Sequence, residues 1–152
     1  MASKDDIDIL IKVRFDYFDT EELDISPEQK VLIETNLKQY YSKHIGLDFY
    51  AAFVETDGEI ASVAFLAIAE KPANLSWPTG KIGTMLNVLT FPKYRRKRYA
   101  TSILNELIGE ARKQKLSYIE LSASESGKPL YHKLGFMERK SSNFVGMKLN
   151  LL

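Results

Sequence analysis

The residues with the clearest chemical potential form a basic run, residues 93–98. Five of these six residues are lysine or arginine, and they lie between an apolar stretch that ends at Phe91 and a helical apolar pattern that begins near Arg98. Ligands of open α/β sheets bind at the carboxyl ends of strands, and a helix N-terminus presents free N–H groups that suit phosphate. Because several cations at that position oppose the helix macrodipole, the run predicts a site for a polyanion.

A charge run has other interpretations. One is a solvated basic turn, and another is a nucleic-acid-binding or import-like patch. The chain lacks the interleaved aromatic residues and the overall basicity expected of a nucleic-acid-binding protein, since 21 Lys and Arg stand against 20 Asp and Glu. We therefore expect no nucleic-acid partner.

Hydrophobic spacing indicates the elements that must position this run. Apolar side chains at helical intervals predict a first helix: Ile7, Leu10, Ile11, Phe15 and Phe18. Ser26 as N-cap, Pro27 at the first helical position and Gln29 as capping-box partner predict a second. Two β-rich runs joined by Asp57-Gly58 then predict a hairpin.

The second half of the chain alternates strands and helices. We predict a strand over residues 82–91, a helix over 98–114, a short strand over 118–122, a short helix over 129–134 and a final strand near 145–149. The crossover helix should make the third and fourth strands parallel neighbours. The order ααβββαβαβ predicts an α/β fold with a mixed sheet, of α+β type, in a single domain over residues 1–152.

Two segments resemble the GNAT acyltransferase superfamily. Residues 95–100, RRKRYA, resemble its Arg/Gln-x-x-Gly-x-Gly/Ala signature, which binds the pyrophosphate of acetyl-CoA, except that Arg98 stands where the family usually has glycine. Residues 123–136, ASESGKPLYHKLGF, resemble a second family segment at a suitable separation. The family's opening strand is not evident. The resemblance implies a GNAT-like acyl-CoA N-acyltransferase fold with acetyl-CoA as cosubstrate.

The resemblance also implies how acetyl-CoA is bound. The strand backbone at Val88, Leu89 and Thr90 would pair with the pantetheine amides as an added strand would. Backbone amides from Arg96 to Thr101 would hold the pyrophosphate. The glycine of the signature permits close approach, so Arg98 fits only with its side chain directed outward. The implied signature residues are Arg95, Arg96, Lys97, Arg98, Tyr99, Ala100 and Thr101.

Tyr131 falls on the tyrosine of the second segment, which in many members donates a proton to the departing CoA thiolate. The resemblance therefore implies a catalytic acid there, although packing beside Leu130 and Leu134 is the other interpretation. Ser124 is implied to hydrogen-bond CoA or a water. The implied mechanism is direct attack of an amine on the thioester, with the oxyanion held by a backbone N–H near Leu89.

No general base is evident, because the predicted cofactor strand has no carboxylate. Asn87 can position a water but is not a base. Carboxylates elsewhere could reach the site, and the sequence does not choose among them: Glu21, Glu22, Glu34 and Glu70.

Charge is divided unevenly along the chain. Residues 1–60 contain 6 basic and 14 acidic side chains, a net charge of −8, whereas residues 61–152 contain 15 and 6, a net charge of +9. The positive half fits a polyanionic cosubstrate. The acidic helices would flank the acceptor side and favour a cationic amine.

Other features exclude some functions. The absence of cysteine excludes disulfides, thiolate metal sites and a cysteine nucleophile. His44 and His132 lack metal-ligand spacing, so we expect no metal. The longest apolar run, residues 60–69, is too short to span a bilayer, and no secretory signal is visible, so we expect no membrane partner and a cytoplasmic protein. An uncovered sheet edge favours a homodimer.

The expected function is transfer of an acetyl group from acetyl-CoA to a primary amine of a small molecule or protein. The alternative is a non-catalytic CoA-binding or protein-interaction module of the same fold. Arg98 in place of glycine and the absence of a carboxylate from the cofactor strand favour that alternative.

Overall fold

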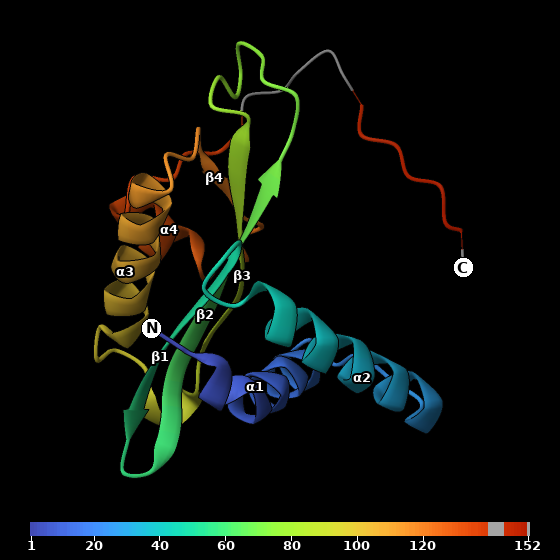
Figure 1. Cartoon of the computed structure of the whole chain (residues 1–152). Coiled ribbons are helices and arrows are strands. Elements are labelled where there is room, and N and C mark those ends of the chain that lie inside the picture. The colour runs from blue at the N-terminus through green and yellow to red at the C-terminus, as the bar shows by residue number, and fades with distance from the viewer. Residues whose placement is uncertain (140–144, 152) are drawn as a thin grey trace. The chain divides into compact units, whose positions relative to one another are not determined.

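The computed structural model describes residues 1–139 and 145–151. Its contacts divide the chain into two compact units, Met1–Ser122 and Ala123–Leu152. The first unit contains a four-stranded sheet of order β1-β2-β3-β4 (Figure 1). Its strands are β1 (Phe49–Thr56), β2 (Glu59–Glu70), β3 (Lys81–Thr90) and β4 (Ile119–Glu120). The first three strands are antiparallel and β4 runs parallel to β3, which confirms the predicted mixed sheet.

The predicted hairpin joins β1 to β2. Asp57 and Gly58 have φ values of 55° and 76°, and Thr56 pairs with Glu59 across the turn. A two-residue turn with positive φ at both central positions matches the twist of the flanking strands. The Asp-Gly pair in the sequence is therefore a direct determinant of this register.

Two helices, α1 (Ile7–Thr20) and α2 (Pro27–His44), follow the 3-10 turn η1 (Lys4–Asp6) and lie on one face of the sheet (Figure 1). The start of α2 is the predicted capping box: the Ser26 hydroxyl accepts from the Gln29 N–H at 3.2 Å, and the Gln29 side chain accepts from the Ser26 N–H at 2.9 Å. Buried side chains of both helices and of the sheet share one core. They include Leu10, Val13, Tyr41, Phe49 and Phe65.

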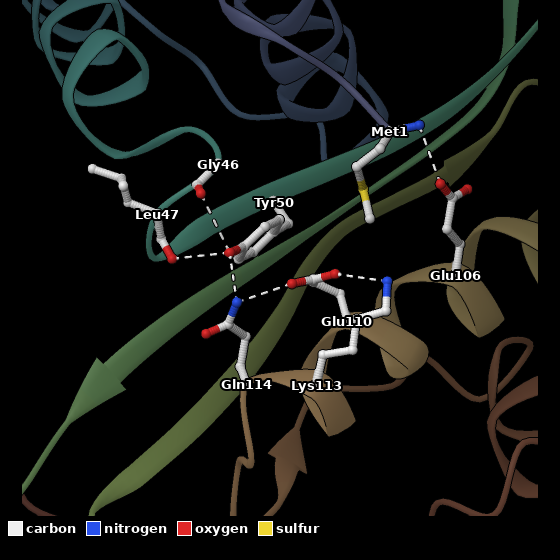
Figure 2. Close-up of polar contacts among 8 residues, drawn as sticks. All are labelled: Met1, Gly46, Leu47, Tyr50, Glu106, Glu110, Lys113 and Gln114. Carbon is white, nitrogen blue, oxygen red and sulfur yellow. Dashed lines mark hydrogen bonds and ion pairs between the residues drawn. The ribbon is translucent and has the colours of Figure 1, made fainter.

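The helix α3 (Tyr99–Lys113) lies on the other face of the sheet (Figure 1). It buries Ile103, Leu104, Leu107 and Ala111, which are four of the apolar positions that predicted the helix. Polar contacts fix its C-terminal end to the start of β1 (Figure 2). Gln114 Nε2 donates to the Tyr50 hydroxyl at 2.9 Å, and that hydroxyl donates to the Leu47 carbonyl at 3.1 Å.

The outer edge of β1 meets the first residues of the chain. No strand precedes β1 in the described part of the chain, as expected from the missing opening strand. The Ala2 N–H donates to the Ala51 carbonyl of β1 at 2.7 Å, and the Met1 amino group lies 3.2 Å from Glu106 Oε1 (Figure 2). These contacts link the first two residues to β1 and α3.

The second unit contains the short helix α4 (Lys128–Lys133), close to the predicted range. The prediction of a final strand near residues 145–149 is wrong, because these described residues form no strand. Val145, Met147 and Leu149 are each more than 80% exposed. Alternating apolar side chains suit a half-buried strand, but a strand exists only where another strand completes its hydrogen bonds.

Candidate active site

Strand β3 is paired with β4 over only part of its length. This strand pairs with β4 only where Gly83 meets Ile119 and Thr84 meets Glu120. On its other side β3 stays paired with β2 as far as Thr90, which lies opposite Ser62. The last residues of β3 therefore have one edge without a strand partner within the described part of the chain. Val88, Leu89 and Thr90, the residues implied to bind pantetheine, lie on this segment.

A β-bulge at Asn87 lies within this open segment. The register of β2 and β3 shifts between Val63 and Phe65, and Asn87 has a φ of 53°. Asparagine tolerates this left-handed conformation better than most residues, and bulges change the direction of a strand's side chains. Asn87 is 2% exposed, and its amide contacts α1, where Arg14 Nη1 donates to Asn87 Oδ1 at 3.1 Å.

The basic run follows β3 and the 3-10 turn η2 (Pro92–Tyr94). The ring of Tyr94 is buried, and its hydroxyl donates to Glu59 Oε2 at 2.7 Å. Lys93 Nζ donates to the same oxygen at 3.1 Å, while Lys97 lies over the Tyr94 ring, 5.5 Å from its centroid. Hydrogen bonds from Tyr94 and Lys93 lower the pKa of Glu59. These contacts anchor the basic run to the first residue of β2.

Tyr94→Phe should test this anchor. The phenyl ring keeps its buried position, whereas Glu59 loses its shortest hydrogen bond, so we expect the free energy of unfolding to fall by about 1 kcal/mol. Acetyl-CoA affinity should fall only a few-fold, because the cations and N–H groups of the run remain. Thermal unfolding and calorimetric titration measure the two effects. An unchanged melting temperature would show that the bond to Glu59 does not stabilise the run.

Two arginines of the basic run have left-handed backbone conformations. Arg96 and Arg98 have φ values of 63° and 62°, and Arg98 is the N-cap of α3. Its side chain is exposed, and its direction relative to a bound pyrophosphate stays a prediction. The same φ explains why glycine suits this place in the family signature, because a Cβ atom is disfavoured there.

Arg98→Gly is expected to stabilise the chain. Glycine relieves the left-handed strain at residue 98, and removal of one cation from a helix N-terminus also stabilises the folded state. The greater conformational entropy of glycine in the unfolded chain offsets part of this effect. We expect a net increase of about 1 kcal/mol in the free energy of unfolding. Arg98→Ala is the matched control, because it removes the charge and keeps the Cβ atom. Chemical denaturation should therefore rank the glycine variant above the alanine variant; the reverse order would contradict the strain at this position.

The start of α3 carries the properties of an anion site. Ser102 N–H donates to the Arg98 carbonyl, but the N–H groups of residues 96–101 have no acceptor among the described residues. The four cations of residues 95–98 also form no ion pair with a carboxylate in residues 1–139 or 145–151. Free N–H groups, uncompensated cations and the helix dipole together favour a phosphate-bearing ligand.

Ser124 and Tyr131 belong to the second unit. Ser124 Oγ accepts from the Gly127 N–H at 3.2 Å at the start of α4. The Tyr131 ring is partly exposed and meets Phe136 edge to face, with 6.0 Å between ring centroids. These contacts describe the local packing of both residues, and their implied roles toward CoA stay predictions.

One of the candidate bases, Glu70, lies far from the end of β3. Glu70 pairs with Lys81 in register, at the opposite end of β3 from Thr90, which is about 30 Å away at the usual rise of a strand. The other three candidate bases, Glu21, Glu22 and Glu34, belong to the first two helices and their connection. Glu21 and Glu22 are exposed and Glu34 is exposed on α2. The general base stays open.

Two other side chains, those of His44 and Trp77, have structural contacts. His44 Nδ1 lies 2.7 Å from Asp48 Oδ1, and its ring stacks on Tyr40. Trp77 Nε1 donates to the Pro72 carbonyl at 2.8 Å, which fits a loop anchor. No cluster of potential metal ligands occurs among the described residues. None of the helices in that part of the chain combines the length and apolarity needed to cross a membrane.

The fold and this site define an α/β protein with an open strand edge that leads into a helix start rich in cations and free N–H groups. The family model described as Acetyltransferase (GNAT) family matches residues 13–136. The chain therefore belongs to the GNAT acetyltransferase family, whose members transfer acyl groups. A search of curated proteins finds no match.

Solved structures share the fold. A predicted acetyltransferase from Clostridium acetobutylicum, solved with acetyl-CoA, is 25% identical with a TM-score of 0.81, and the match covers 97% of this chain and 92% of that one. A GCN5-related N-acetyltransferase from Ralstonia eutropha is 19% identical with a TM-score of 0.76, over 97% and 95% of the two chains. A ribosomal-protein-alanine N-acetyltransferase from Brucella melitensis is 15% identical with a TM-score of 0.65, over 96% of each chain.

Proposed function

We propose that this chain is an N-acetyltransferase that transfers the acetyl group of acetyl-CoA to a primary amine of a small molecule or protein. One observation carries the proposal: the open edge of β3 leads within a few residues into a helix start with free N–H groups and uncompensated cations. A ligand with amides at one end and a pyrophosphate at the other matches both features. The acetyl-CoA in the Clostridium acetobutylicum relative supports this choice.

The binding residues follow from these two features. The backbone of Val88, Leu89 and Thr90 would pair with the pantetheine amides by strand addition. The N–H groups of residues 96–101 would hold the pyrophosphate, and the arginine and lysine side chains would add charge. Ser124 would hydrogen-bond CoA or a water. The full proposed signature set is Arg95, Arg96, Lys97, Arg98, Tyr99, Ala100 and Thr101.

The chemistry needs no covalent enzyme intermediate. Acetyl-CoA supplies an activated acyl thioester. The neutral amine attacks the acetyl carbon, so that a C–N bond forms and the C–S bond breaks. The nitrogen loses one proton and the CoA thiolate gains one, so the proton from the nitrogen finally restores the group that protonates the thiolate, and CoA leaves as a thiol. A backbone N–H near Leu89 would stabilise the oxyanion, and Tyr131 would donate a proton to the CoA thiolate.

Calorimetric titration with acetyl-CoA tests the first half of the proposal. Binding is expected in the micromolar range, and its absence at high micromolar concentration would overturn acetyl-CoA as the donor. Thiol release in the presence of an amine panel tests the second half. Binding without amine-stimulated thiol release would favour the alternative, a non-catalytic CoA-binding or protein-interaction module of the same fold.

Three further expectations stay predictions. The family match spans both compact units, which supports one domain over residues 1–152. A homodimer would cover exposed apolar side chains such as Leu32, which is 63% exposed on α2. A cytoplasmic location rests on the sequence alone.

A further inference from the structure

We infer that the amine acceptor carries a carboxylate, and that the guanidinium of Arg14 on α1 binds it. This inference rests on the proposed acetyl transfer and names the class of its acceptor. It makes Arg14 a residue that determines specificity. Sequence patterns do not indicate this role, because Arg14 lies in no motif and its hydrogen-bond partner, Asn87, is 73 positions away in the chain.

Arg14 lies beside the bulge in β3. Its Nη1 donates to Asn87 Oδ1 at 3.1 Å, and Asn87 Nδ2 donates to the Val13 carbonyl at 3.4 Å. The guanidinium also lies over the Phe18 ring, 4.7 Å from its centroid. The aromatic contact and the hydrogen bond hold the guanidinium in place, so little conformational entropy remains to be lost when it binds a ligand.

Within the described part of the chain, the charge of Arg14 has no counter-ion. The side chain is partly buried, and no carboxylate in residues 1–139 or 145–151 pairs with it. Its hydrogen-bond partner is a neutral amide. A guanidinium has five N–H donors, and one of them is used by Asn87, so donors remain for a carboxylate in the two-pronged geometry that arginine prefers. A partly desolvated charge without a partner favours binding of an anion.

The position along β3 connects this site to acetyl transfer. Asn87 immediately precedes Val88, Leu89 and Thr90, the segment proposed to pair with pantetheine. Asn87 contacts α1 on the face of the sheet covered by α1 and α2 (Figure 1), and α3, with its basic N-terminus, lies on the other face. An acceptor held by Arg14 would therefore approach the end of β3 from the α1 side, while the pyrophosphate is held at the start of α3.

This inference opposes the expectation drawn from the net charge of residues 1–60. That expectation uses the sum of charges, many of which are exposed or paired, as Asp16 is with Lys12 at 2.7 Å. The contacts of Arg14, in contrast, describe the local charge at the proposed acceptor site. A cationic acceptor would meet an uncompensated guanidinium at close range, so the two expectations predict opposite substrate preferences.

Matched amines provide the test. Acetyl-CoA-dependent thiol release is measured with glycine against glycinamide, β-alanine against β-alaninamide, O-phosphoethanolamine against ethanolamine, and ethylenediamine as the cationic arm. We expect kcat/KM to be about 10- to 100-fold higher for the carboxylates than for their amides, the range of a charged hydrogen bond. Preference for O-phosphoethanolamine over the carboxylates would overturn the carboxylate as the anion. Equal or better use of the amides or of ethylenediamine would overturn the inference.

Variants assign the preference to Arg14. Arg14→Gln should raise KM for the carboxylates by about 10- to 100-fold, while leaving KM for the amides and the Kd of acetyl-CoA unchanged. Arg14→Lys keeps the charge and should retain part of the preference, which covers failure of the glutamine variant to fold. Lys12→Gln is the matched control, since Lys12 pairs with Asp16 on the same helix. An unchanged preference in Arg14→Gln would overturn the inference.

The test also separates this inference from the proposed function. Binding of acetyl-CoA to the wild-type chain with acetylation of neither member of any pair would overturn the carboxylate acceptor and leave the donor site intact. Failure of acetyl-CoA to bind would instead overturn the proposed function, and this inference with it.

Discussion

Replacing both Arg95 and Arg96 by alanine is expected to weaken acetyl-CoA binding about 100-fold or more, because two charge-assisted hydrogen bonds to phosphate contribute about 1.5–3 kcal/mol each. Both side chains are exposed and neither forms an ion pair in the described part of the chain. Their removal therefore leaves no partner charge unsatisfied in the free protein. We expect the free energy of unfolding to stay the same or rise slightly, since two cations leave a helix N-terminus.

A control with the same change in net charge separates local contacts from general electrostatics. Lys43→Ala with Arg112→Ala removes two exposed cations from the ends of α2 and α3. Calorimetric titration should show nearly wild-type affinity for this control. If both double variants lose affinity equally, the overall positive potential holds acetyl-CoA, and the basic run has no specific role.

Local sequence patterns predicted most of the first unit correctly. Ser26 caps a helix and Asp57-Gly58 forms a turn. Each feature depends on contacts between residues at most three positions apart, so the local sequence is sufficient to predict it. The apolar spacing of α3 likewise depends only on which face of the helix is buried. The crossover helix then fixed the parallel pairing of β3 and β4 by a rule of chain connection.

The contacts that shape the site depend on distant parts of the chain. Arg14 and Asn87 are separated by 73 positions, and Glu59 and Tyr94 by 35. Neither pair has a local pattern, because each residue by itself fits an ordinary solvated position. The bulge at Asn87 was also missed, although an asparagine inside an apolar strand is a weak signal for a left-handed residue.

The C-terminal strand shows the opposite error. Val145, Met147 and Leu149 alternate with polar or small residues, and this alternation is a property of the segment alone. Whether a strand forms depends on a partner edge, which no local pattern specifies. In the described structure these side chains are exposed, so the pattern predicted a capacity for pairing that the chain does not use there.

Tyr131→Phe is expected to lower kcat by about 100- to 10,000-fold while leaving acetyl-CoA affinity unchanged, the range for loss of a positioned acid. Phenylalanine keeps the aromatic contact with Phe136 and the backbone hydrogen bond from the Phe136 N–H to the carbonyl of residue 131. The change therefore removes the hydroxyl proton donor and preserves the packing of α4. Steady-state kinetics with a saturating amine, together with calorimetric titration, measure the two effects.

Packing and proton donation predict different outcomes for the same variant. If Tyr131 only packs against its neighbours, the phenylalanine variant should turn over at the wild-type rate, since the ring is retained. Tyr40→Phe makes the same chemical change on α2, where the ring stacks on His44, and should leave kcat unaffected. A large loss of kcat in Tyr131→Phe with normal binding and normal Tyr40→Phe activity would identify the hydroxyl as the acid. Because the leaving thiolate must gain a proton for CoA to depart as a thiol, the loss should be largest for the weakest amine nucleophiles, whose reactions depend most on expulsion of the thiolate.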